Sequence, residues 1–213
     1  MSDSVANDVA TTTRRRRVLT ELKRHAPFTS LGALTGVGVM VALVLLRIPH
    51  ETSALVFDVL HPMHVLFSAV VTAALYRRYK RNLLFTVIIG YVGSVGIGTL
   101  SDIVLPYLGG RLMGAHMHLH IGFIEHWWLV NPLALAGVGL ALWRPWTKLP
   151  HTGHMFLSTW ASLFYLTAHG EAEWLPLLPV IFVVLFVAVW LPCCLSDIIF
   201  PLLFVGKAGE EHH

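Results

Sequence analysis

Residues 174–195 have the sequence WLPLLPVIFVVLFVAVWLPCCL, an apolar run without a charged side chain. A second uncharged run, TSLGALTGVGVMVALVLL, occupies residues 29–46. Each run is long enough for a helix to cross the ~30 Å hydrocarbon core of a bilayer, which takes about 20 residues. Only 13% of the 213 residues are charged, against roughly 25% in a typical soluble domain. The sequence therefore predicts an all-α, polytopic membrane protein.

Six transmembrane helices are expected, at 29–48, 54–77, 82–108, 127–143, 150–169 and 174–205. The basic segments of the chain, Arg14–Arg17, 77–81 and 144–148, all fall on one side of this arrangement. Because basic loops are retained in the cytoplasm, both termini are predicted to be cytoplasmic and the protein to lie in the cell (inner) membrane. The same bias explains the N-terminal basic run better than nucleic-acid binding does, so the expected partner is the lipid bilayer.

Three short motifs occur twice, in the same order in the two halves of the chain. Residues 32–38 match 133–139, the HPMH of 61–64 with Ser68 matches the HTGH of 151–154 with Ser158, and the SDIVLP of 101–106 matches the SDIIFP of 196–201. Each half holds three predicted helices, an odd number, so the two halves must enter the bilayer from opposite sides. Such inverted-topology repeats occur in many secondary transporters, although a fold alone does not establish a function.

These repeats define the organisation of the chain. The expected segments are a disordered basic cytoplasmic tail over 1–28, a first three-helix repeat over 29–110, a His-rich extracytoplasmic connector over 111–126, a second three-helix repeat over 127–205 and a C-terminal tail over 206–213. The third helix of each half is expected to break near its Ser-Asp pair. Glycines precede Ser101 and Pro192 precedes Ser196, and both residue types weaken a helix. The alternative is that the glycines form a small-residue packing face.

Each half offers two histidines and an aspartate as candidate metal ligands. These are His61, His64 and Asp102 in the first half and His151, His154 and Asp197 in the second. Histidines three residues apart lie on one face of a helix, and imidazole is a good ligand for Zn, Cu, Fe and Ni. A charged carboxylate inside a membrane costs ~2.5–3.5 kcal/mol, which a bound cation would offset. The topology places the first set near the outer face and the second near the inner face; the competing interpretation is that these histidines cap helices or bind headgroups.

The connector carries three histidines at alternating positions, His116, His118 and His120. On an extended segment alternate side chains point to one face, and short His-rich tracts commonly bind metal. We expect this tract to capture ions outside the membrane before they enter the helices. The alternative is an amphipathic interfacial segment beside an aromatic belt formed by Trp127 and Trp128.

Ser68 and Ser158 each follow a candidate ligand by four residues, about one helical turn. We expect their hydroxyls to bond helix carbonyls or groups around a metal site rather than to act as nucleophiles. The sequence contains no phosphate-binding glycine loop, no Gly-x-Ser-x-Gly motif and no His-Glu-x-x-His motif.

The sequence favours a transporter or permease for a divalent transition-metal ion, with zinc as the first expectation and Fe, Ni or Cu as alternatives. Alternating access would expose the two matched His/His/Asp sets in turn. A membrane-embedded metalloenzyme with a His-ligated iron or zinc centre is the second interpretation. A b-type haem electron carrier, for example with His64 and His169 as axial ligands, is the third. Whether the protein is an enzyme, and whether it forms a homo-oligomer, stays open at this level.

Overall fold

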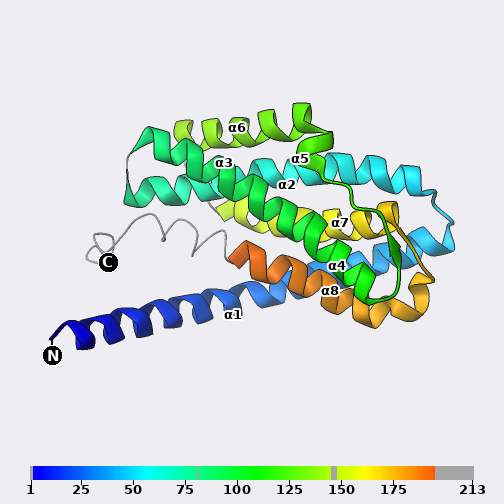
Figure 1. Ribbon diagram of the computed structural model, residues 1–213, viewed down its shortest axis with the longest axis horizontal. Helices are drawn as coiled ribbons and strands as arrows, with labels where there is room; N and C mark the ends of the chain where they lie inside the picture. The colour runs from blue at the N-terminus through cyan, green and yellow to red at the C-terminus, as the bar shows by residue number, and fades with distance from the viewer. Residues whose placement is uncertain (1, 81, 145–147, 195–213) are drawn as a thin grey trace.

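The computed structural model describes residues 2–80, 82–144 and 148–194. Within these residues the chain is almost entirely helical, as predicted (Figure 1). The helices are α1 (Ser2–Leu45), α2 (His50–Tyr79), α3 (Leu83–Thr99), a π-helical turn η1 (Leu100–Val104), α4 (Leu105–Leu112), α5 (Gly122–Glu125), α6 (Trp127–Trp143), α7 (Lys148–His169) and α8 (Trp174–Cys194). Two short strands, β1 (His116–Met117) and β2 (Gly170–Glu171), form one antiparallel pair.

Among the residues that the structure describes, four stretches of helix are long and apolar enough to cross a bilayer. They are Ala26–Leu45 in α1, His50–Arg78 in α2, Leu83–Leu112 over α3, η1 and α4, and Trp174–Cys193 in α8. α6 is also apolar but has 17 residues, equivalent to about 25 Å of helix. These lengths and compositions are those of a helical membrane protein.

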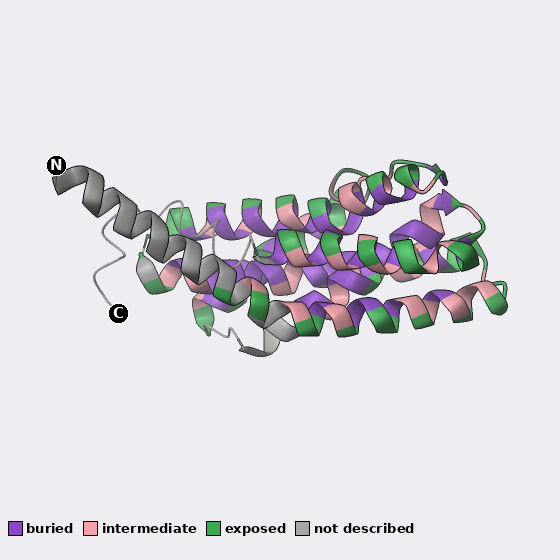
Figure 2. Ribbon diagram, turned by 90° about the horizontal axis from the view of Figure 1, so that it is seen from below, coloured by how far each residue is buried: buried purple, intermediate pink, exposed green. Residues whose placement is uncertain are grey.

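The bundle is apolar outside and partly polar inside, the reverse of a soluble protein. Large apolar side chains are exposed on the outer faces of the helices, among them Leu55, Val59, Leu84, Leu135 and Val183. Buried residues line the inward faces of the same helices (Figure 2). They include histidines, serines, threonines and one aspartate. Exposed apolar surface of this extent suits lipid rather than water, and polar groups in membrane helices usually face the bundle interior.

α2 and α7 lie side by side at the centre of the bundle (Figure 1). α1 and α8 pack on α7 and on each other, while α3 and α6 pack on α2 and on each other. Glycines allow close approach. A Cβ on Gly137 of α6 would lie 2.8 Å from the Ala69 Cβ of α2, and one on Gly90 of α3 would lie 2.9 Å from the Ala73 Cβ. Gly90 of the third predicted helix therefore lies at a close helix contact, whereas an added Cβ on Gly96 would have no neighbour within 4 Å.

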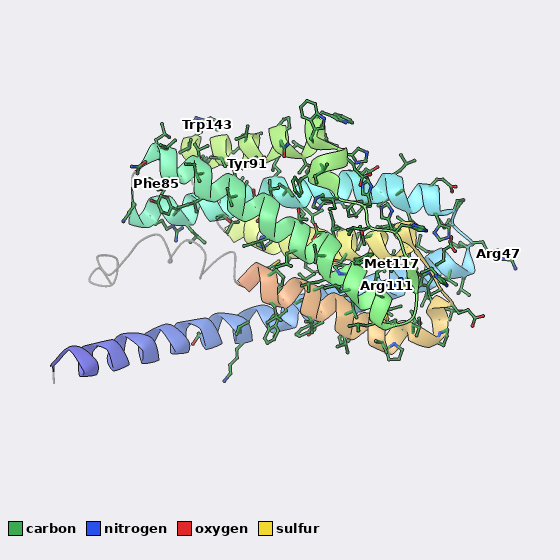
Figure 3. The ribbon with its side chains drawn as sticks, in the orientation of Figure 1. Arg47, Phe85, Tyr91, Arg111, Met117 and Trp143 are labelled. Carbon is green, nitrogen blue, oxygen red and sulfur yellow. The ribbon has the colours of Figure 1, made fainter. Side chains whose placement is uncertain are left out.

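The turns between helices gather at two ends of the bundle (Figure 3). Arg47, in the turn between α1 and α2, lies at the end opposite Phe85 and Trp143. Arg111 and Met117 lie toward the same end as Arg47. The α1–α2 turn, the connector and the β1–β2 pair thus share one end, which we call the connector end.

The third predicted helix does not break at its Ser-Asp pair. α3 instead continues through the π turn η1 into α4. Pro106 lacks an N–H and cannot make the α-helical hydrogen bond to the carbonyl of Asp102, and a π turn accommodates this change of register. The consequence for the site is that Asp102 lies inside the bundle, 0% exposed.

The predicted disordered tail over 1–28 also differs from the structure, because α1 begins at Ser2. Residues 2–26 contain neither glycine nor proline, so no strong helix breaker occurs there. The C-terminal end of the sixth predicted helix and the tail over 206–213 lie outside the described residues.

Candidate metal centre

α2 presents His61 and His64 on the face that meets η1. The Nδ1 atoms of both histidines lie within hydrogen-bond distance of the same oxygen of Asp102, Oδ2, at 2.9 and 2.7 Å. All three side chains are buried. The structure thus brings together the three residues of the first predicted set.

Serine hydroxyls hold the second oxygen of the Asp102 carboxylate. Ser101 donates to Oδ1 over 2.8 Å, and Ser158 of α7 donates over 2.7 Å. Ser162, also on α7, donates to the backbone carbonyl of Ser101 over 3.0 Å and so ties the π turn to α7. The Ser158 hydroxyl therefore bonds a group of the candidate site, as expected, but the group belongs to the other half of the chain.

These hydrogen bonds determine which nitrogen of each imidazole can bind something else. An ionised carboxylate only accepts hydrogen bonds, so His61 and His64 each carry a proton on Nδ1, which leaves Nε2 as the ligand atom. Nε2 of His61 is buried without a hydrogen-bond partner in the described part of the chain. Carboxylates orient metal-binding histidines in this way. Asp102 is therefore better placed to orient the two imidazoles than to bind an ion itself.

His154 of α7 lies beside this group rather than at a separate inner site. Its ring stacks on that of His64, with the centroids 5.7 Å apart and the planes 13° from parallel. The expected separation fails for His154 because α7 packs along α2 and brings the two rings to the same level. The side chain of His151 and all of Asp197 lie outside the described residues. We call His61, His64, Asp102, His154 and Ser158 the buried cluster.

Among the described residues, no lysine or arginine bonds the carboxylate of the buried cluster. In the described structure its hydrogen bonds come from His61, His64, Ser101 and Ser158. Removing an unpaired carboxylate from water costs several kcal/mol. The cluster therefore requires a positive charge, supplied by a protonated imidazole or by a bound cation.

A second group of potential ligands lies toward the connector end. Ligand atoms of Asp58, His120 and His126 all lie within 4.8 Å of one another. Asp58 is on α2, His120 is on the connector, and His126 is the N-cap residue of α6. The His169 ring, at the end of α7, stacks on that of His120 with the centroids 4.7 Å apart. We call these four residues the outer cluster.

The three alternating histidines of the connector do not lie on one face. His116 and His118 are exposed, whereas His120 is half-buried against His169. Strand β1 ends at Met117, so the alternation of an extended segment does not continue to His120. The structure therefore brings one residue of the predicted tract, His120, into a group with ligand spacing.

Phe57 lies between the two clusters. Its ring stacks on His61 at a centroid distance of 5.3 Å and meets His120 and His169 edge-on at 6.2 and 5.9 Å. His64 and His169, the example of a bis-histidine haem pair, belong to different clusters.

Sequence patterns had not singled out Asp58, although it precedes His61 and His64 at three-residue spacing and so shares their helix face.

Two further residues had no clear sequence signal. His126 follows a glutamate in the connector and is one of thirteen histidines, so its type alone does not distinguish it. Ser101 precedes Asp102, and only the π turn directs both side chains to the same place.

Comparison of the chain with protein-family models, with curated proteins and with solved structures found no match.

Proposed function

We propose that the protein is an integral membrane transporter for a divalent transition-metal ion, with zinc as the first candidate. The observation that carries this proposal is that both halves of the chain contribute to the buried cluster. His61, His64 and Asp102 come from the first half, while His154 and Ser158 come from the second. In transporters built from inverted repeats the substrate site lies at the interface between the repeats.

The packing of the helices supports an inverted repeat. In the proposed duplication α1, α2 and α3 correspond to α6, α7 and α8. If each helix is replaced by its counterpart, every pair of packed helices corresponds to another pair that is also packed. The α1–α7 contact becomes α6–α2, the α1–α8 contact becomes α6–α3, and the central α2–α7 contact is unchanged. This is the pattern that an internal duplication with two-fold pseudosymmetry produces.

Individual contacts follow the same exchange. Gly137 of α6 packs on Ala69 of α2, and Gly36 of α1 packs near Thr159 of α7, where an added Cβ would lie 3.8 Å from the threonine Cγ2. The repeated motifs align Gly36 with Gly137 and Ala69 with Thr159. These contacts at aligned positions support the proposed equivalence of the two halves.

Imidazole ligands favour zinc and neighbouring transition metals, whereas calcium and magnesium prefer oxygen ligands. His61 and His64 would bind the ion through Nε2, and Asp102 would orient them and balance its charge. His154 stacks on His64, so we assign it to this same site, at the interface between the two halves. Alternating access would expose this shared site to each side of the membrane in turn.

Six membrane crossings, cytoplasmic termini and an inner-membrane location are part of the proposal. Trp127 and Trp128 at one end of α6 and Trp143 at the other are all exposed, as expected for the two aromatic belts of a crossing helix. The basic segments would then face the cytoplasm. A reporter fused after residue 213 that is active only outside the cytoplasm would contradict this topology.

A membrane-embedded metalloenzyme is the second candidate, and one observation favours it. His154 and His64 belong to a single buried group. An enzyme needs one metal centre, not two separate ion-binding sites. The difference is open to test, because a transporter moves its ion across the membrane whereas an enzyme retains it.

The experiment that tests the proposal is ion uptake by liposomes that contain only this protein. Zinc uptake should be saturable and should disappear in His64→Ala. His118→Ala is the matched control, because this exposed histidine belongs to neither cluster, and it should transport normally. Zinc that binds the purified protein but never crosses the membrane would favour the enzyme.

A further inference from the structure

We infer that the outer cluster is a second metal site, in which Asp58, His120, His126 and His169 bind one zinc-class ion at the connector end. The binding itself follows from these four residues alone. Its role in loading the buried cluster rests on the proposed function.

Three of the four residues already have nearly the required spacing. Their ligand atoms lie within 4.8 Å of one another, and two of them, His126 Nδ1 and Asp58 Oδ1, are 3.2 Å apart. Neighbouring ligands of a tetrahedral zinc ion are about 3.3 Å apart, as its bond lengths of about 2.0–2.1 Å require. Small side-chain movements therefore suffice to form the site.

His169 supplies the fourth ligand. Nε2 of His120 and Nε2 of His169 are both buried and, within the described residues, make no hydrogen bond. A buried polar atom without a partner costs roughly 1–3 kcal/mol, and these two belong to rings stacked at 4.7 Å. One ion bound by both nitrogens would satisfy them together.

Glu125 holds His120 in the orientation that metal binding requires. Its Oε2 lies 2.7 Å from His120 Nδ1, and its Oε1 accepts a hydrogen bond from the Ile121 backbone N–H over 3.0 Å. Because Nδ1 of His120 faces the Glu125 carboxylate, Nε2 is the nitrogen left to bind an ion.

The ligand set identifies the class of ion. Three imidazoles and one carboxylate, without a thiolate, suit Zn²⁺ and chemically similar divalent ions and disfavour the oxygen-preferring Ca²⁺ and Mg²⁺. Asp58 and Glu125 supply two negative charges close to the ion. Asp58 and His126 are each 31% exposed, so an ion can reach the cluster from water.

The alternative is that these residues form hydrogen bonds which only fasten the connector to α2. Titration of the full-length protein in detergent with Co²⁺ separates the two explanations, because tetrahedral Co²⁺ has a characteristic visible spectrum. Asp58→Asn and His126→Gln should each remove one equivalent of tetrahedral Co²⁺. Glu125→Gln should keep that equivalent and weaken its binding by about 10–100-fold, the usual effect of losing an orienting partner.

The controls distinguish this site from the buried cluster and from unfolding. His118→Ala should bind like the parent protein, and His64→Ala should retain the outer equivalent. Thermal unfolding without metal shows whether each variant is folded. If Asp58→Asn and His126→Gln are folded and still bind the outer equivalent as the parent does, the inference is overturned. Lack of zinc uptake by protein that binds this equivalent would contradict the proposed transport and leave the site in place.

Discussion

The buried cluster and the outer cluster use the same residue types, imidazoles and a carboxylate, in opposite surroundings. Asp102 is fully covered, and both of its carboxylate oxygens accept hydrogen bonds. Asp58 is 31% exposed. Nε2 atoms without a partner among the described residues occur in both clusters, at His61, His120 and His169. Under the inference above, the outer cluster would take an ion from water, whereas hydrogen bonds from the protein itself hold the carboxylate of the buried cluster.

One face of α2 connects the two environments. Asp58 belongs to the outer cluster, and His61 and His64, three and six residues later, belong to the buried one. The ring of Phe57 stacks on His61 and meets the outer histidines edge-on. Under the proposed function, an ion that moves inward along α2 must pass this ring.

Asp102→Asn should have the largest effect. Asparagine keeps the shape of the side chain but loses the charge and turns one acceptor into a donor, which faces hydroxyl or imidazole donors. The free energy of unfolding should fall by about 3–5 kcal/mol, the range for breaking a buried charge pair, and zinc uptake should stop. Asp58→Asn should lower the free energy of unfolding by about 1 kcal/mol or less, the usual contribution of an exposed ion pair. Similar losses in thermal unfolding for the two variants would remove the contrast between the clusters.

Ser158→Ala tests the link between the halves with a smaller effect. It removes one hydrogen bond to the Asp102 carboxylate, and bonds to charged groups contribute about 1.5–3 kcal/mol. The matched control is Ser94→Ala, because Ser94 is equally buried but donates to the Tyr91 carbonyl within its own helix. Loss of the Ser94 hydrogen bond in the control should lower the free energy of unfolding by about 0.5–1.5 kcal/mol. If Ser94→Ala loses as much stability as Ser158→Ala, the hydrogen bond from Ser158 to Asp102 contributes no more than an ordinary hydrogen bond within a helix.

His126→Gln should change the concentration dependence of uptake. Loss of the outer ligand should raise the zinc concentration for half-maximal uptake by at least ~10-fold and leave the maximal rate near that of the parent protein. The reason is that loading from dilute solution becomes harder while the buried cluster is unchanged. Uptake rates over a series of external zinc concentrations measure this, and a lower maximal rate at unchanged half-saturation would contradict it.

The double variant His116→Ala, His118→Ala should have the smallest effect. Both side chains are exposed, and neither belongs to the group with ligand spacing. Zinc affinity and half-saturation should stay within about two-fold of the parent values, well below the 10–100-fold effect of an orienting partner. A strong loss of affinity would instead support the whole connector tract as the capture segment.

The helices were predictable because apolar runs and turns mark them directly. Residues 127–143 were predicted as a helix and form α6, and the predicted fifth helix ends at His169, as α7 does. The grouping of His61 with His64 followed from their three-residue spacing. Their approach to Asp102 followed from placing the second and third helices at the same depth. Metal binding at these residues stays a prediction.

The remaining features depend on packing between distant segments. His154 meets His64 because α7 lies along α2, and no local pattern specifies how two helices from different halves align. Ser158 reaches Asp102 for the same reason. The π turn replaces the expected break because the inward bonds of Asp102 and the Ser162 bond to Ser101 hold the backbone together. His120 separates from His116 because the extended conformation ends at Met117.

The most direct test of transport through the buried cluster is counterflow of labelled zinc in liposomes that contain this protein alone. The parent protein should exchange labelled for unlabelled zinc across the membrane. His126→Gln should do so at raised zinc, and Asp102→Asn should not do so at any concentration. Consistent absence of flux for Zn²⁺, Fe²⁺, Mn²⁺, Ni²⁺ and Cu⁺, while metal remains bound in a manner that depends on His64, would contradict transport and favour a membrane metalloenzyme.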